Sequence, residues 1–328
     1  MPLTKIQTTT GTVNPTELGR TLIHEHIMVG YPGWELDATA PRFKRADGLA
    51  RAVDQMHELQ SHGVRTFVDP CPMDLGRDAE FLAEVAQRSG MHIICTTGAY
   101  FEAEGNTYTF RHLSVEQITE IYIREIEDGI GDTGIKAGAI KVATGAPTVS
   151  PYERKLVTAG ARAAKATGVP VISHTQDACC GHDQIDIVTG EGLAADRLVV
   201  GHSDGADDHA YHRSLAERGA FVGFDRFGIS MFQPDEVRVA NVIKLIEAGH
   251  LERVLMSHDS IVCWLGRPVP YAQSFDDLLK MLPKWRSNHI FKEIVPMMRE
   301  RGVSDAQIET ILVSNPQRLF SAGLGHAH

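Results

Sequence analysis

The sequence predicts an α/β protein that folds as a (β/α)8 (TIM) barrel. Eight short runs of apolar, largely β-branched residues recur along the 328 residues, and segments of helical periodicity separate them. Such alternation indicates a parallel sheet, and near-continuous apolar strands indicate that both faces of the sheet are buried. Polar side chains follow several of the strands, at the end where such barrels carry their functional residues. Closure of the sheet into a barrel accounts for all three observations.

The strands and helices can be placed in order along the chain. The eight strands are predicted at residues 21–29, 64–70, 92–98, 137–144, 169–175, 197–203, 220–225 and 252–259. Helices are predicted at residues 49–63, 78–90, 152–168 and 236–250, several ending in glycine where a left-handed cap is expected, and two more at 290–302 and 304–320. Residues 260–288 are predicted to form an extended loop over the barrel mouth. A doubly wound open sheet is the alternative, but no G-x-G-x-x-G follows the first strand.

Composition limits the class of protein. The length suits a single domain over residues 1–328. The composition, with 43% hydrophobic and 23% charged residues, is typical of a soluble globular protein. No apolar run is long enough for a membrane span, and the N-terminus lacks a signal-peptide pattern. Five cysteines without CxxC spacing argue against a disulfide framework and a zinc ribbon, which predicts a reducing, cytoplasmic location. A net charge of −10 without a basic patch favours a small-molecule partner over nucleic acid or a membrane.

Histidines and an aspartate at strand ends are candidate metal ligands. His24 and His26 are two residues apart on a predicted strand, so their side chains should share a face while Glu25 points away. Ordinary hydrogen bonds could also satisfy this pair. His174, His202 and Asp259 each end a buried strand, where a polar ring or a carboxylate needs a partner to offset its desolvation. A bound cation would be such a partner.

Lys141 places an amine within the buried strand GAIKVAT. Desolvation favours its neutral form, which can react with carbon dioxide to give a carbamate. The alternative is an ion pair with a carboxylate of the barrel. The number of other ligands favours the carbamate, because four histidines and one aspartate hold two ions only if another group bridges them.

Motifs over nearly the whole chain resemble the phosphotriesterase family of the amidohydrolase superfamily, including its phosphotriesterase-like lactonases. They are TLIHEH (21–26), GRDAEFLAEV (76–85), REIEDGIGDTGIKAGAIKVAT (124–144), ATGVPVISHT (166–175), GHSDGADD (201–208), SHD (257–259) and SNPQRLFS (314–321). The resemblance implies a TIM barrel with two divalent metal ions, such as zinc, cobalt, manganese or iron, and a homodimer. It implies that His24, His26 and Asp259 hold the buried ion, that His174 and His202 hold the exposed ion, and that carbamylated Lys141 bridges them together with a hydroxide.

The implied reaction is hydrolysis by attack of the metal-bridging hydroxide on a lactone carbonyl or a phosphoryl centre. Asp259 would accept the proton. Tyr100 resembles a tyrosine that lactonases place near the substrate oxygen, although it could equally be a buried aromatic bonded to a backbone carbonyl. Arg226 stands where lactonases carry arginine and organophosphate hydrolases often carry histidine; its alternative is an ion pair with Asp225. These two residues favour a lactonase with secondary phosphotriesterase activity.

Residues 260–288 differ from the lactonase pattern, since CWLGRPVP brings in two prolines and an arginine. Trp264, Leu265 and Phe275 could line a channel for an acyl chain or could pack the loop down. Arg267 is the one cation of this loop that is expected to suit a phosphorylated substrate. A second departure is Gly205, where the family often has an aspartate of a proton relay; the adjacent Asp204 is expected to point elsewhere.

Several functions remain as alternatives at this stage. The main hypothesis is hydrolysis of acyl-homoserine, γ- or δ-lactones. The alternatives are an organophosphate triesterase (aryldialkylphosphatase) and a hydrolase of another carboxyl ester, an amide or a phosphorylated sugar lactone. A non-catalytic binding protein on a barrel scaffold would require an incomplete set of metal ligands, and the set is complete.

Overall fold

A computed structural model describes residues 5–105 and 107–324. Its centre is a sheet of eight parallel strands, which confirms the predicted barrel. The strands, in sheet order, are β3 (Arg20–Leu22), β5 (Val64–Asp69), β6 (His92–Gly98), β7 (Ala139–Thr144), β8 (Val171–Thr175), β9 (Leu198–Val200), β10 (Phe221–Phe224) and β11 (Val254–Met256). Among the described residues, no helix is both long enough and apolar enough to cross a membrane.

The first predicted strand, residues 21–29, is divided in the structure. It forms β3 and, after His24 and Glu25, a separate strand β4 (His26–Val29) that leaves the barrel wall. The cause is tertiary, because Asp69 accepts a hydrogen bond from the backbone N–H of Ile27 and the N–H of His26 donates to the carbonyl of Ser260. His24 therefore lies within the break between the two strands, and His26 begins the second strand.

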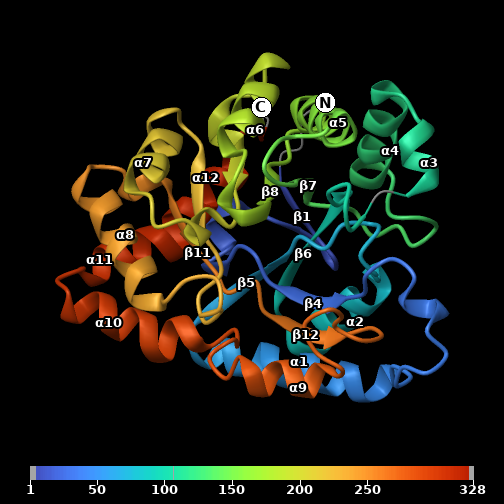
Figure 1. Ribbon diagram of the computed structural model, residues 1–328, viewed down its shortest axis with the longest axis horizontal. Coiled ribbons are helices and arrows are strands. Elements are labelled where there is room, and N and C mark those ends of the chain that lie inside the picture. Colours follow the sequence, from blue (N-terminus) through green and yellow to red (C-terminus); the bar gives the residue numbers. More distant parts are fainter. Residues whose placement is uncertain (1–4, 106, 325–328) are drawn as a thin grey trace.

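The predicted loop at residues 260–288 contains two regular elements. Strand β12 (Ile261–Trp264) pairs in parallel with β4, and Figure 1 shows this ribbon beside the barrel opening. Helix α9 (Phe275–Met281) follows, capped by the side chain of Ser274. The prediction that residues 260–288 form an extended loop is thus wrong for these two segments, because β4 supplies the pairing partner that β12 needs.

Helices surround the strands (Figure 1). They are α1 (Arg45–Ser61), α2 (Ala79–Ser89), α3 (Tyr108–His112), α4 (Val115–Glu127), α5 (Pro151–Thr167), α6 (Gly181–Gly190), α7 (His209–Glu217), α8 (Asp235–Glu247), α10 (Val295–Glu300), α11 (Asp305–Glu309) and α12 (Asn315–Ser321). As expected, α2 and α5 end in left-handed glycines, Gly90 at φ 73° and Gly168 at φ 92°. The predicted C-terminal helices are confirmed as α10 to α12 with the short π-helical turns before them.

Side chains of alternate strand residues fill the barrel interior. Ala139 on β7 and Ile172 on β8 belong to this inner apolar cluster, together with Ile23, Val68, Ile94, Val199, Phe221 and Leu255. Successive strand residues point to opposite faces, so the residue two positions further on points into the barrel as well. In β7 this residue is Lys141 and in β8 it is His174. Both polar groups therefore lie inside, one layer nearer the carboxyl ends of the strands.

Candidate metal centre

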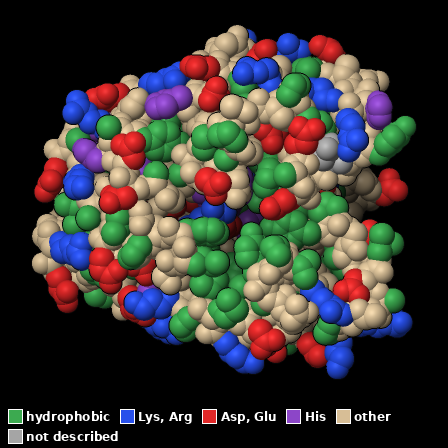
Figure 2. All heavy atoms as spheres, viewed as in Figure 1, with side chains coloured by type: hydrophobic (Ala, Val, Ile, Leu, Met, Phe, Trp, Pro, Cys, Tyr) green, Lys and Arg blue, Asp and Glu red, His purple; other side chains and the backbone are tan. Residues whose placement is uncertain are grey.

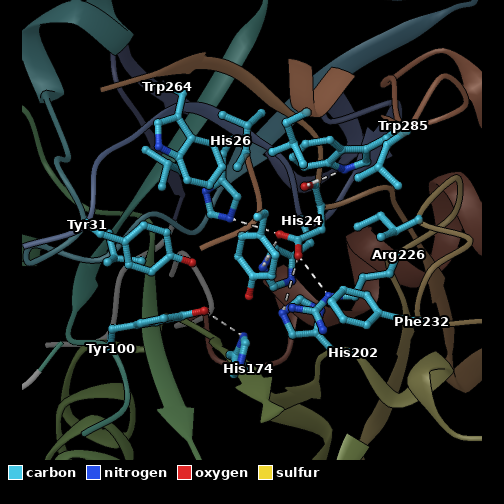
Figure 3. A pocket seen from close by; sticks show the side chains of 18 of the residues that line it. His24, His26, Tyr31, Tyr100, His174, His202, Arg226, Phe232, Trp264 and Trp285 are labelled. Carbon is cyan, nitrogen blue, oxygen red and sulfur yellow. Dashed lines mark hydrogen bonds and ion pairs between the residues drawn. The ribbon is translucent and has the colours of Figure 1, made fainter. Parts of the chain in front are cut away.

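The six predicted ligands converge at the carboxyl ends of the barrel strands. They come from the segment after β3, from β4, β7 and β8, and from the turns after β9 and β11. Figure 3 shows the four histidines arranged around one cavity. His202 and Asp259 adopt left-handed backbone conformations, with φ of 59° and 54°, that residues other than glycine seldom adopt. Such strain is typical of functional sites, where the surrounding structure enforces a particular side-chain position.

The Asp259 carboxylate is the centre of the cluster. Its Oδ1 is 3.2 Å from Nε2 of His26 and 3.7 Å from Nε2 of His24, and its Oδ2 is 3.8 Å from Nε2 of His202. One ligand atom each from His24, His202 and Asp259 lie within 4.8 Å of one another. A single cation could contact these three atoms, since ring nitrogens and carboxylate oxygens bind zinc at about 2.0–2.2 Å.

Buried carboxylates orient the histidine rings from behind. Asp225 accepts hydrogen bonds from Nδ1 of His24 at 2.9 Å and from Nδ1 of His202 at 2.8 Å. Asp69 contacts Nδ1 of His26 at 3.2 Å. A proton held at Nδ1 leaves the Nε2 lone pair free, and carboxylates commonly fix metal-binding histidines in this way. Each ring therefore presents Nε2 to the cavity.

The protonation of the rings also suits a metal. Burial and the positive charge of Arg226 lower the pKa of His202 to about 3. Burial lowers the pKa of His24 and, together with His202, holds that of His174 well below its usual value. Neutral imidazole is the form that binds metal ions. His26 differs, because hydrogen bonds to Asp259 and Asp69 raise its pKa well above the usual value despite burial; a cation would take the place of that proton.

His174 is held by contacts at both ring nitrogens. Its Nε2 donates to Oε1 of Gln176 at 3.0 Å, and the side-chain amide of Gln176 in turn contacts Asp177. This leaves the lone pair on Nδ1, which lies 3.2 Å from the hydroxyl of Tyr100. Tyr100 therefore points into the centre rather than to a backbone carbonyl. Burial raises the pKa of Tyr100 well above 10, so that its hydroxyl stays protonated and can donate a hydrogen bond.

Lys141 is buried and its amine is 2.9 Å from Nε2 of His24. Desolvation lowers the pKa of Lys141 to about 8, although Asp259 and Asp225 oppose the shift. No carboxylate forms an ion pair with Lys141 among the described residues. The alternative of a simple ion pair is thus not observed, and the neutral amine makes up about a tenth of Lys141 at pH 7.

Arg226 pairs with Asp259 and not with Asp225. Its Nε donates to Oδ2 of Asp259 at 3.0 Å, while both oxygens of Asp225 are used by His24 and His202. Arg226 lies on one side of the cavity and Tyr100 on the other (Figure 3). The cavity therefore has a cation and a neutral hydroxyl donor facing each other across the ligand cluster.

Apolar and aromatic side chains form the wall above the ligands. Figure 2 shows a hollow on this face of the molecule with hydrophobic side chains along its border. The lining comes from the end of β4, from the loops after β4, β5, β6 and β10, and from the segment of β12 and α9: Val29, Tyr31, Pro72, Leu75, Tyr100, Ile229, Met231, Phe232, Ile261, Trp264, Tyr271, Leu278, Leu282 and Trp285. Such a wall suits a substrate with an uncharged, apolar part.

The four loop residues singled out in the sequence lie in different places. Trp264 does line it, with its ring 5.8 Å from that of Tyr31. Leu265 is instead buried in the main core, outside the pocket lining. Arg267 also lies outside, where its guanidinium pairs with Asp37 at 3.0 Å. Phe275 packs behind Trp264 without lining the pocket. The channel expected of Trp264, Leu265 and Phe275 is therefore bordered only by the first.

Asp204 does not replace the aspartate that Gly205 lacks. Its carboxylate accepts from Nε of Arg238 at 2.8 Å and from the backbone N–H of Arg226 at 3.0 Å. Burial raises the pKa of Asp204 to about 6. The side chain thus faces the buried Arg238, as expected, and holds the segment that carries Arg226.

Sequence reasoning missed two groups of site residues. Asp69 and Asp225 end buried strands, the same signal that identified Asp259, but their role depends on which histidine each one faces. Asp69 also accepts a hydrogen bond from the backbone N–H of Cys71. As a result, one ligand atom each from His26, Asp69 and Cys71 lie within 4.8 Å of one another. The second group is the wall at Ile229, Met231, Phe232, Tyr271 and Trp285, for which the local sequence carries no signal.

Comparison with known proteins agrees with the geometry of the centre. Residues 4–320 match the model of the phosphotriesterase family. The chain is similar to the organophosphorus hydrolase of Deinococcus radiodurans, with a TM-score of 0.92 and 38% identity over 97% of both chains. A variant of a PTE-like lactonase from this organism gives a TM-score of 0.91 at 38% identity, over 96% of this chain and 99% of the other. The aryldialkylphosphatase of Saccharolobus solfataricus is 31% identical over 94% of this chain and 97% of its own length. The chain therefore belongs to the phosphotriesterase family and is a metal-dependent hydrolase.

Proposed function

We propose that the protein hydrolyses lactones that carry an apolar substituent, with weaker activity on phosphotriesters. The observation that carries this proposal is the form of the pocket, in which an apolar wall surrounds the ligand cluster and the Tyr100 hydroxyl faces it. A lactone is uncharged, so it needs no cation at the pocket mouth, and its carbonyl oxygen can use a hydrogen-bond donor. The similarity to a PTE-like lactonase agrees with this assignment.

The donor set fits two divalent ions. His24, His26 and Asp259 would hold one ion, His174 and His202 the other, and Lys141 would bridge them as a carbamate formed by its neutral amine and carbon dioxide with release of a proton. The fit is supported by Nδ1 contacts that direct Nε2 of His24 and His202 into the cavity, by the Lys141 amine 2.9 Å from Nε2 of His24, and by the neutral state of these buried rings. When bound, such ions would lower the pKa of a water to make it a nucleophile and would polarise the substrate carbonyl.

The protein's own groups complete the proposed mechanism. The Tyr100 hydroxyl would donate to the oxygen on which negative charge develops as the carbonyl is attacked. The Asp259 carboxylate, whose pKa neighbouring histidines and Arg226 hold well below its usual value despite burial, would be ionised and able to accept the proton of the attacking water. Arg226, bonded to Asp259, would keep that carboxylate in position and line the substrate side of the pocket. The apolar wall would exclude bulk water.

The alternative substrates differ in what they require of the pocket. A phosphotriester is also uncharged, so the wall alone does not distinguish it from a lactone. A phosphorylated sugar lactone would need an unpaired cation near the mouth, whereas Arg226 is paired with Asp259 and Arg267 is paired with Asp37 outside the pocket lining. The structure thus supports an uncharged substrate more than a phosphorylated one.

Initial rates on a matched panel of substrates test the proposal. The cobalt- or manganese-loaded enzyme would be assayed with γ- and δ-lactones, acyl-homoserine lactones and an aryl dialkyl phosphate. We expect lactones to exceed the phosphate ester at least tenfold in kcat/KM, which corresponds to about 1.4 kcal/mol of transition-state preference. A Tyr100→Phe variant should reduce this preference because it lacks the donor. A higher kcat/KM for the phosphate ester would overturn the lactonase assignment, and no turnover on the panel by metal-replete enzyme would exclude both functions.

A further inference from the structure

Two adjacent cysteines and a backbone carbonyl meet outside the metal centre. The sulfurs of Cys179 and Cys180, in the loop between β8 and α6, are 3.4 Å apart. The carbonyl oxygen of Pro147, in the loop after β7, is 3.3 Å from the Cys179 sulfur and 3.5 Å from the Cys180 sulfur. Three donor atoms therefore stand at the corners of a nearly equilateral triangle. The predicted absence of a zinc ribbon does not bear on this pair, because a ribbon needs two separated CxxC motifs.

The geometry favours a shared cation over a disulfide. Neighbouring Cα atoms are about 3.8 Å apart, which is less than the roughly 4.4 Å needed for an unstrained disulfide. Both thiols are free in the structure. Bonds of about 2.3 Å from a cation to thiolate sulfur would span the 3.4 Å between the two sulfurs without moving either residue.

The backbone of this loop is held in an uncommon conformation. Asp177, Ala178 and Cys180 have positive φ angles of 54°, 52° and 66°, although none is glycine. Conformations of this kind cost free energy and are concentrated at ligand sites, where the structure must aim particular groups. Here their result is that both sulfurs face the Pro147 carbonyl, while Cys179 remains partly exposed to solvent. The open side leaves room for a water as a fourth ligand.

The charge around the thiols suits a cation as well. Burial and the Cys179 sulfur raise the pKa of Cys180 to about 12, and the carboxylates of Asp183 and Glu153 add to the rise. The negative field that disfavours a lone thiolate attracts a positive ion. An ion must displace the thiol protons, so its affinity should increase with pH.

We propose that Cys179, Cys180 and the Pro147 carbonyl form a third metal site, selective for a thiophilic divalent cation such as Cd²⁺ or Zn²⁺. Thiolate ligands select soft ions, whereas the histidine and carboxylate ligands of the catalytic centre accept harder ones. An ion here joins the loop after β7 to the loop after β8. Strand β7 carries Lys141, and strand β8 carries His174. Gln176, which bonds to His174, belongs to the same loop as the two cysteines.

Cadmium titration of the metal-free enzyme tests this site directly. Thiolate ligation produces an ultraviolet sulfur-to-cadmium charge-transfer band, which nitrogen and oxygen ligands do not produce. We expect the wild type to develop this band and to bind one more Cd²⁺ per chain, by equilibrium dialysis, than the Cys179→Ser and Cys180→Ser variants, which should lack the band. Cys71→Ser is the matched control, because Cys71, beside His26 and Asp69, is the other thiol placed where it could contact a cation; this variant should keep the band.

Each outcome decides the proposal. A wild-type enzyme without the band excludes the site whether or not the serine variants fold. A band that survives in both variants, or disappears in Cys71→Ser, assigns the ion to another thiol and overturns the proposal. As a second readout, cadmium should protect two thiols per chain from a thiol-specific reagent in the native wild type, and loss of this protection in either variant is expected.

Discussion

Asp225 contacts a ligand of each of the two proposed ions. Its Oδ2 holds Nδ1 of His24, and its Oδ1 holds both Nδ1 and the backbone N–H of His202. Burial alone would raise the pKa of Asp225, but the two histidines hold that pKa well below its usual range. A single carboxylate therefore sets the orientation of two neighbouring rings, whose centroids are 4.7 Å apart.

Replacing Asp225 with asparagine should weaken metal binding. The amide nitrogen of the new side chain can only donate, so one of the two histidines loses its acceptor. We expect affinity to fall about 10- to 100-fold, as for other partners of metal-bound histidines. Competition with a chromogenic chelator measures the loss, and Asp132→Asn, at an exposed position, is the control. Unchanged affinity in Asp225→Asn would contradict the orienting role.

Asp259→Asn should remove most of the turnover. The variant keeps the size of the side chain but lacks the carboxylate that is proposed to take up a proton, and general-base groups contribute about 10²- to 10⁴-fold. We expect kcat to fall at least about a hundredfold. Measurement of kcat with elemental analysis of the same sample separates lost chemistry from lost metal. A variant that retains both its ions and near-normal kcat would rule out Asp259 as the base.

Carbamylation of Lys141 should depend on pH in the metal-free enzyme. The folded-state pKa of Lys141, about 8, lies below its usual value of 10.5. The neutral amine is therefore the major form above pH 8, and its share falls about tenfold for each pH unit below that. At a fixed concentration of dissolved carbon dioxide, the rate of metal reconstitution should rise with pH and level off above about 8. A rate independent of carbon dioxide, or a flat profile between pH 6 and 8, would argue against a carbamate.

At the scale of elements, the first and last barrel strands are joined beyond their ends by hydrogen bonds of a buried side chain and of the backbone, without a ladder between β3 and β11 in the described residues. Glu25, between β3 and β4, accepts hydrogen bonds from the hydroxyl and backbone groups of the segment after β11. Its partners are Ser257, His258 and Ser260. Because β3 and β11 share no strand pairing in the described residues, this buried carboxylate and the bond from Asp259 N–H to the His24 carbonyl join the two edges.

Glu25→Gln should therefore destabilise the fold. An amide nitrogen would face donors on the segment after β11, and loss of a buried hydrogen bond to a charged group costs about 1.5–3 kcal/mol. We expect a decrease of about 2 kcal/mol in the free energy of unfolding, seen as a lower urea midpoint. Glu217→Gln, in an exposed pair with Arg213, should change the midpoint little. Equal midpoints for the two variants would disprove the role of Glu25.

Most elements could be predicted from the sequence, and so could the six candidate ligands that the fold brings together, because strand ends and buried polar residues are local signals. Lys141 and His174 could be placed inside the barrel from their alternation with Ala139 and Ile172. The break after β3 could not be predicted, since it depends on distant groups that bind the N–H of His26 and Ile27. The same holds for Leu265 and Arg267, because their positions follow from the pairing of β12 with β4.

At the scale of the whole molecule, the ligands come from segments spread from His24 to Asp259. Ions bound to the folded state alone would stabilise it by about 2.7 kcal/mol each at one hundred times Kd. We expect removal of the ions to lower Tm by several degrees, and Tm to rise again with added cobalt or manganese in a concentration-dependent manner. Calorimetry of metal-free and reconstituted samples measures this. A Tm independent of metal would indicate that the ligands do not hold ions in the folded state.

The β4–β12 ribbon limits how this enzyme can acquire new substrates during evolution. Residues 26–29 and 261–264 are bonded to each other and adjoin the metal ligands, so insertions there would displace His26 or Asp259. The segments 227–234 and 265–274 carry neither a metal ligand nor Arg226, yet they supply Ile229, Met231, Phe232 and Tyr271 to the wall. We therefore expect sequence changes in these two wall segments to leave the metal ligands in place, and changes in the β4–β12 ribbon to disturb them. Exchange of these two segments between relatives is thus the route by which the pocket can be reshaped while its hydrolytic machinery is inherited intact.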